Sequence, residues 1–340
     1  MASRLTQRSR MRRTSRRSLV FALVLLAAIA GAIYLSRGRR LTPEPGPAPG
    51  KLIARFLDIG QGDAELIQLP DGETILIDSG DRGAPTDELL GQFGVRQIDL
   101  IIATHPHADH IGDMREVLRR FKVKEFWDAG FPYSTKTYTD LLQEIKDRGI
   151  KLSVPKQGES RRLGEVLLEV LHPTLDLPDN NPNNASVVVR LTFGATRLLF
   201  TGDTEIESWK QMLQSENDSL RADLLKAAHH GSSNGTSEAV LNAVHPSVYT
   251  ISCASGNDFH HPHPGVMNLL DRHREVAVYR TDLQGTITAV CDGNTIQMQT
   301  EKQVAGGRLY LTGDEVAGKV ASDGSGRKAL TRQRGAGHTR

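Results

Sequence analysis

Cysteine is nearly absent from this chain. Its 340 residues include two, Cys253 and Cys291, and these lack the C-x-x-C spacing of cysteine-rich zinc sites. This excludes a cysteine-ligated metal centre and a scaffold built on several disulfides. Both cysteines lie in apolar stretches, so we expect two buried strand thiols, with a single disulfide as the alternative in an oxidising compartment.

Aromatic residues are also scarce, at 5%, and basic residues are scarce away from the two ends. Residues 41–300 hold 24 Lys or Arg against 36 Asp or Glu, so the formal net charge of +2 conceals an acidic body. Proteins that bind a nucleic-acid duplex normally carry a basic stripe, and single-strand binders stack bases on aromatic rings. The composition therefore disfavours a long groove for nucleic acid, and it is compatible with a small phosphate ester as the substrate.

One long apolar run stands out, the 19 uncharged residues 18–36. At 1.5 Å per residue it matches a hydrocarbon layer of about 30 Å. Seven arginines precede it and three follow, which places the amino terminus in the cytoplasm and the body outside. We expect a single-pass membrane protein; the alternative is a cleaved signal peptide, for which "AIAGA" (28–32) offers small residues, and a secreted body.

The amino-acid composition changes along the chain and divides it into five segments. We expect a basic cytoplasmic segment (1–18), a transmembrane anchor or signal (19–36), a Pro/Gly-rich linker (37–51), a folded domain (52–300) and a largely disordered tail (301–340). Within the domain, short β-branched runs such as "ETILIDSG" predict strands, and periodic runs such as "YTDLLQEIKDRG" predict helices. Strands first, then strands alternating with helices, indicate layered sheets with helices outside.

A cluster of histidines and an aspartate directly follows one predicted strand. "IDLIIATHPHADH" (98–110) contains His105, His107, Asp109 and His110 in six positions. Imidazole nitrogens and carboxylate oxygens are ligands for Zn²⁺, and with more oxygen ligands for Mn²⁺ or Fe²⁺. Without a metal, several desolvated polar groups would remain unpartnered, which costs a few kcal/mol each.

This cluster resembles the HxHxDH signature of the metallo-β-lactamase fold. "ILIDSG" (75–80), "LLFTGD" (198–203) and "LLKAAHHGS" (224–232) resemble further motifs of that fold, in the same order. "FLDIGQGDAELIQLPDG", "NNASVVVRL" and "RTDLQGTI" resemble the soluble hydrolase domain of ComEC-type competence proteins, the channels for DNA uptake. The resemblance covers about residues 52–298 and implies a four-layer αββα fold. With one predicted anchor in place of a multi-span pore, this chain cannot itself be the channel.

The resemblance also implies ligands for two divalent metal ions, with Zn²⁺ preferred and Mn²⁺ the alternative. His105 and His107 would hold the first ion, Asp109 and His110 the second, and Asp203 would bridge them. For the last ligand His229 and His230 compete, and we favour His230 because it immediately precedes Gly231. Asp78 would lie beneath the site and orient a ligand histidine.

The sequence departs from the family where many members supply a further histidine ligand. This chain has "DNNPNNA" there, and His172 is the nearest histidine. We keep His172 as a possible ligand, but favour a weaker first site completed by water or Asn184. Asp63, in the turn "DIGQGDA", is expected near the metal rim.

Paired divalent ions acidify shared water and neutralise charge on the substrate. Asp109, His229 and His261 are the candidate catalytic residues, with the two histidines as proton donors to the leaving group. These features favour a phosphodiesterase or nuclease acting on DNA or another extracytoplasmic phosphodiester. Hydrolysis of a carbonyl ester or lactam, and a non-catalytic anchored metal-binding assembly module, are the alternatives.

Overall fold

The computed structural model describes residues 50–319, except 175, 178 and 216–219. The predicted cytoplasmic segment, the predicted anchor, most of the predicted linker and residues 320–340 lie outside the described residues. All described residues belong to one of the two units of the chain, Pro45–Arg340. No helix within this described part is both long enough and apolar enough to cross a membrane.

The first sheet has eight strands, in the order β15-β14-β1-β2-β3-β4-β5-β6. Pairing is antiparallel from β15 to β3 and parallel from β3 to β6. The strands are β1 (Leu52–Phe56), β2 (Glu65–Gln68), β3 (Thr74–Ile77), β4 (Gln97–Ala103), β5 (Lys122–Asp128), β6 (Lys151–Ser153), β14 (Ile287–Cys291) and β15 (Ile296–Thr300).

The second sheet has seven strands, in the order β13-β12-β11-β10-β9-β8-β7. Pairing is parallel from β13 to β10 and antiparallel from β10 to β7. The strands are β7 (Ser160–Leu163), β8 (Val166–His172), β9 (Val188–Phe193), β10 (Thr196–Phe200), β11 (Leu224–Lys226), β12 (Val248–Ile251) and β13 (Ala277–Arg280).

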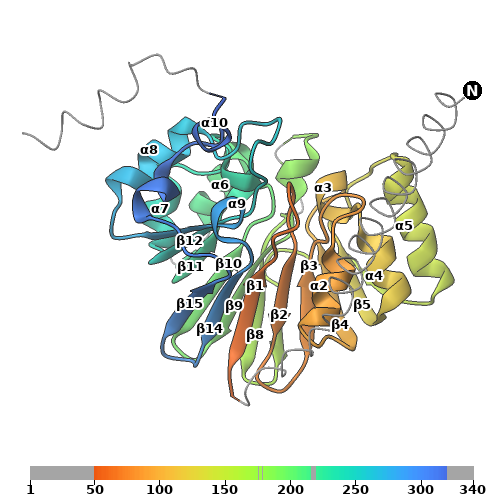
Figure 1. Cartoon of the computed structure of the whole chain (residues 1–340). Helices are drawn as coiled ribbons and strands as arrows, with labels where there is room; N and C mark the ends of the chain where they lie inside the picture. Colours follow the sequence, from red (N-terminus) through yellow and green to blue (C-terminus); the bar gives the residue numbers. More distant parts are fainter. Residues whose placement is uncertain (1–49, 175, 178, 216–219, 320–340) are drawn as a thin grey trace, which may run out of the picture. The chain divides into compact units, whose positions relative to one another are not determined.

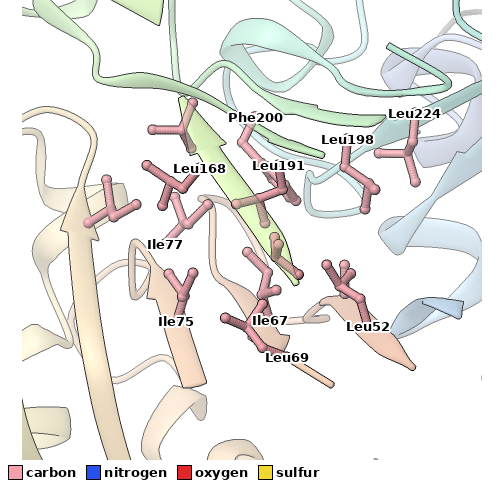
Figure 2. Close-up of a cluster of buried hydrophobic side chains, with 14 of the residues drawn as sticks. Leu52, Ile67, Leu69, Ile75, Ile77, Leu168, Leu191, Leu198, Phe200 and Leu224 are labelled. Atoms are coloured by element: carbon pink, nitrogen blue, oxygen red, sulfur yellow. The ribbon is translucent and has the colours of Figure 1, made fainter. Parts of the chain in front are cut away.

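The two sheets pack face to face around the central core. Successive side chains of a strand point to opposite faces of the sheet. Leu198 and Phe200 of β10 therefore point to the central core between the two sheets, whereas Leu199 points to the outer core between the second sheet and its helices. Figure 2 shows Ile67 and Ile75 of the first sheet opposite Leu168 and Leu191 of the second. Each such fully buried side chain contributes about 1.5–3 kcal/mol to folding.

Helices cover the outer face of each sheet, which completes four layers (Figure 1). On the first sheet lie α2 (Thr86–Gln92), α4 (Met114–Arg120) and α5 (Lys136–Asp147), and on the second α6 (Ile206–Ser215), α7 (Glu238–Val244) and α8 (Pro264–Arg272). The shorter helices are α3 (Ala108–Ile111), α9 (Thr281–Gln284), α10 (Gly313–Ala317), η1 (Pro182–Ala185), η2 (Ala228–Gly231) and η3 (Gly306–Tyr310). The predicted αββα arrangement is confirmed.

Two outcomes refine the sequence expectations. Cys253 and Cys291 are both buried free thiols, as expected. The ordered structure continues past the expected boundary at residue 300, through η3 and α10 to residue 319. Tyr310 packs on the outer core of the second sheet, and Arg280 donates hydrogen bonds to the carbonyl oxygens of Leu309 and Leu311, which explains why this polar segment is held.

Candidate metal centre

The candidate site lies where parallel strands of both sheets end. In the first sheet Asp78 follows β3, and the segment from His105 to His110 follows β4. In the second sheet Asp203 follows β10, and His229 and His230 lie in η2 after β11. Side chains at the carboxyl ends of parallel strands meet at one edge, so segments more than 100 residues apart converge there.

The local backbone is shaped for this convergence. His107 is the N-cap of α3, so Asp109 and His110 lie within the single turn of that helix. His229 and His230 both have positive φ values, 49° and 53°, a left-handed conformation that few non-glycine residues adopt. The amide of His229 donates to the carbonyl oxygen of Gly202, 3.1 Å away, which joins the two loops of the second sheet.

Asp203 is the centre of the cluster. Four imidazole Nε2 atoms lie 3.3–3.9 Å from its Oδ2: those of His110, His230, His229 and His105, in order of increasing distance. Asp109 Oδ2 lies 3.3 Å from His230 Nε2 and 3.9 Å from His110 Nε2, and His107 Nδ1 lies 3.0 Å from His105 Nε2. The structure thus brings the six residues expected as ligands into one cluster: His105, His110 and His230 lie near Asp203, and His107 and Asp109 lie near those histidines.

The orientation of two rings fits a metal ion. His110 Nδ1 lies 2.7 Å from Asp78 Oδ2, and His230 Nδ1 lies 3.0 Å from the carbonyl oxygen of Ser252. Carboxylate and carbonyl oxygens only accept, so each Nδ1 carries the proton and each Nε2 can offer a lone pair. Both Nε2 atoms and Asp203 Oδ1 are buried and find no hydrogen-bond partner among the described residues. Such atoms are costly unless a cation binds them.

The charges of the cluster are strongly coupled. Burial lowers the pKa of His230, but Asp203 and Asp63 outweigh burial and raise it to about 10. Burial is likewise outweighed at His110, where Asp203, Asp78 and Asp109 hold the pKa well above its usual range. Burial and then the nearby His110 lower the pKa of both His105 and His107, so these two rings are neutral and need lose no proton to bind a cation.

His172 is not brought onto Asp203 with the others. Its ring is buried, and its Nδ1 lies 2.9 Å from the carbonyl oxygen of Ser186, whose hydroxyl is 3.5 Å from His105 Nδ1. Asn184 is engaged too, since its Oδ1 accepts from the amide of Glu205 and its Nδ2 donates to Asp179. Ser186 therefore lies between His172 and the His105 ring.

The two proton-donor candidates differ in their surroundings. His229 Nδ1 lies 3.2 Å from Glu205 Oε1, and hydrogen bonding to His229 lowers the pKa of Glu205. The His261 ring centroid lies 5.4 Å from that of His229, but burial and then His230 and His229 lower its pKa to about 3. His229 thus has a carboxylate neighbour, whereas the low pKa of His261 keeps that ring neutral near pH 7.

A buried ion pair that the sequence did not predict lies behind the site. Asp63 contacts Lys226 with one carboxylate oxygen, and its other oxygen lies 3.3 Å from His230 Nδ1. Asp63 was expected near the rim, and Gly62 explains how it gets there. At φ 127° Gly62 packs on Asp109, where a Cβ would clash with the Asp109 carbonyl oxygen. The only sequence signal for Lys226 was a charged residue in the apolar strand "DLLK".

Asp78 provides a direct test of the ring orientation. Asp78 is itself fixed by Thr104, whose amide and hydroxyl both donate to its carboxylate, over 2.8 and 2.6 Å. We expect Asp78→Asn to lower metal affinity about 10–100-fold, because an amide NH₂ facing Nδ1 favours the tautomer with the proton on Nε2. Asparagine also tolerates the positive φ of 56°, so the fold should persist. Chelator competition measures the affinity, with Asp292→Asn in an exposed turn as the control; equal affinity in both variants would refute the orientation.

The raised pKa values predict opposite effects of pH on the metal-free and metal-bound protein. In the metal-free protein the raised pKa of His230 stabilises the fold fully below pH 6.5, and this contribution is lost as pH rises through about 10. A metal ion must displace a proton from His230 and another from His110, so its apparent affinity should rise about tenfold per pH unit for each proton displaced. Calorimetric titrations at pH 6.5 and 8.5, in buffers of different ionisation enthalpy, measure both the affinity and the protons released. An affinity independent of pH would contradict the assignment.

Comparison with known proteins agrees with this geometry. The family model described as the Metallo-beta-lactamase superfamily matches residues 57–255. ComE operon protein 3 of Bacillus subtilis is 32% identical over 252 residues, which cover 68% of this chain and 32% of that protein. Competence protein ComA of Neisseria gonorrhoeae is 26% identical over 289 residues, covering 78% and 38%. The solved structure of CmlA, a diiron beta-hydroxylase from Streptomyces venezuelae, is 17% identical with a TM-score of 0.49, covering 72% of this chain and 55% of that one. The chain spans about a third of the length of each of the two curated relatives.

Proposed function

The chain belongs to the metallo-beta-lactamase superfamily of hydrolases, and on that premise we propose that it is a metal-dependent phosphodiesterase, with DNA or another phosphodiester outside the cytoplasm as substrate. The observation that carries the metal dependence is the convergence of four imidazole Nε2 atoms on Asp203, together with the buried unpartnered Nε2 atoms of His110 and His230. The preference for a phosphodiester is supported by the similarity to competence protein ComA and by the sequence resemblance to ComEC-type competence proteins.

We propose two divalent ions, with Zn²⁺ preferred over Mn²⁺ because imidazole outnumbers carboxylate in the set. His105 and His107 would hold one ion and Asp109, His110 and His230 the other, with Asp203 shared. When bound, the ions acidify water and neutralise charge that develops on the substrate. The chain's own residues fix the ligand tautomers through Asp78 and the Ser252 carbonyl.

The leaving-group proton is assigned to His229. Its side chain is 22% exposed, so it can reach a substrate, and its Nδ1 lies 3.2 Å from Glu205 Oε1. The low pKa of His261 leaves that ring to hydrogen-bond as a neutral imidazole, beside His229. His229 thus fits the role of general acid better than His261, whereas Asp109 fits a ligand role.

Location outside the cytoplasm is part of the proposal. It is supported by the uncharged run 18–36 and its arginine-rich amino-terminal flank. Protease added to intact cells that express the chain with a carboxyl-terminal tag should remove the tag. A tag that is cut only after lysis would contradict this orientation.

Parallel assays with the full chain test the reaction. We expect cleavage of single-stranded DNA or of bis(p-nitrophenyl) phosphate that a chelator abolishes and Zn²⁺ or Mn²⁺ restores. A chromogenic lactam should stay intact. Lactam cleavage with both phosphodiesters untouched would replace the proposal by carbonyl hydrolysis, and tight metal binding without turnover of any substrate would favour an assembly module.

A further inference from the structure

One exposed aromatic ring lies beside the candidate metal centre. Phe259 is 58% exposed, the most exposed large hydrophobic side chain among the described residues and the only aromatic in that group. Its ring stacks on His261, with centroids 5.8 Å apart and planes 21° from parallel. His261 in turn lies 5.4 and 6.0 Å from the rings of His229 and His230. The ring of His261 therefore lies between Phe259 and the site residues His229 and His230.

The loop that carries Phe259 is tightly held from within. Asn257 is buried, and its Oδ1 accepts hydrogen bonds from the amides of Phe259 and His261, at 3.1 and 2.9 Å. Its Nδ2 donates to the carbonyl oxygens of His261 and Ala254. His263 Nε2 donates to the carbonyl oxygen of Phe259, over 2.9 Å. The amide and the carbonyl oxygen of Phe259 are thus both hydrogen-bonded, which holds the backbone at this position in place.

The carboxyl-terminal segment holds the same loop from outside. The amide of Gly313 donates to the carbonyl oxygen of Pro262, and Asp314 accepts from His260. Lys319 Nζ donates to the carbonyl oxygens of Gly256 and Asn257. A phenyl ring on a loop this constrained is exposed in advance, which reduces the entropy lost when a ligand stacks on it.

From this arrangement we propose that Phe259 is a stacking platform for a nucleobase attached to the phosphodiester in the site, an inference that rests on the proposed function. A flat ring that is stacked on His261 and is 58% exposed suits a planar aromatic group. Base stacking on a protein ring contributes about 1–3 kcal/mol per base, with little dependence on sequence. A single platform also agrees with the acidic body, which lacks the basic residues for a long groove. The substrate class is therefore nucleic acid, held at one nucleotide beside the scissile bond.

A kinetic test compares the metal-loaded full chain with Phe259→Leu and Phe259→Trp on two substrates. One is a short single-stranded oligonucleotide, and the other is the same strand with tetrahydrofuran abasic sites in place of nucleotides. We expect Phe259→Leu to raise KM for the normal strand about 5–100-fold, with kcat nearly unchanged and no effect on the abasic strand. Phe259→Trp should keep the normal KM, and Leu152→Ala, at another exposed apolar side chain, should change neither. Equal effects of Phe259→Leu on both strands, or no effect, would overturn the platform.

A binding test separates this inference from the reaction itself. The chain's own Trp127 and Trp209 are buried, so the added fluorescence of Phe259→Trp reports on position 259. We expect thymidine 5′-monophosphate to quench it and deoxyribose 5-phosphate to leave it unchanged. Quenching without any phosphodiester cleavage would refute the proposed function and keep the platform. Cleavage without base-dependent quenching would refute the platform alone.

Discussion

We expect Asp203→Asn to abolish metal binding and hydrolysis together, which is the largest expected effect of any substitution on activity. Asp203 is 2% exposed, and within the described part of the chain its carboxylate alone lies within 4 Å of the Nε2 atoms of four histidines. An amide has the same shape but no charge, so it neither attracts cations nor stabilises protonated His110 and His230. The loss should exceed the roughly 10–100-fold expected when an outer partner of a ligand is removed.

The measurement is the metal content of the purified full chain, by elemental analysis, alongside its turnover of a phosphodiester. Asp147→Asn, at the exposed end of α5, is the matched control and should behave as the wild type. Circular dichroism checks that the variant is folded, so that loss of metal is not loss of structure. A folded Asp203→Asn protein with full metal content would exclude Asp203 as a shared ligand.

Lys226→Met has the largest expected effect on stability. Lys226 and Asp63 are each 1% exposed, and their charges face each other in the interior. Burial opposes both charges, but the pair sustains them: Lys226 lowers the pKa of Asp63, and Asp63 raises that of Lys226. Removing the lysine leaves the buried Asp63 carboxylate with the histidines His230 and His110 beside it, and breaking a buried ion pair costs about 3–5 kcal/mol of unfolding free energy.

Denaturant unfolding of the metal-free chain measures this cost. The double variant Asp63→Leu/Lys226→Met should recover most of the stability, because no unpaired charge remains. Lys136→Met removes a lysine from the exposed pair with Asp140 and should leave the stability nearly unchanged. If Lys226→Met is no more destabilising than Lys136→Met, the buried pair does not have the assigned energetic role.

Much of the site could be predicted because several of its metal-binding side chains lie close together in the sequence. His105, His107, Asp109 and His110 lie within six positions, and a strand and a helix on either side fix their directions. Asp203 and His230 lie far along the chain, but each follows an apolar strand and matches a motif of the resemblance. Asp78 was assigned in the same way, and its contact with His110 is as expected.

The parts that were missed depend on pairings that leave no local pattern. Asp63 and Lys226 are 163 residues apart, and their contact exists only because the two sheets pack face to face. The segment from η3 to α10 is too polar to predict a folded element, and hydrogen bonds to the Phe259 loop hold it. β5 was missed as well, since Lys122, Lys124 and Glu125 interrupt its apolar run. Glu125 is accommodated there by Lys151 and Arg161 from outside the strand.

We propose that cations bind at Asp203, at the edge where the two sheets meet. The most direct measurement is an anomalous-difference map, recorded at the absorption edge of the bound metal from crystals of the full chain grown without chelator. We predict peaks within bonding distance of His110 Nε2, His230 Nε2 and the Asp203 carboxylate. A map without a peak among these atoms, from protein shown to retain its metal, would contradict the account.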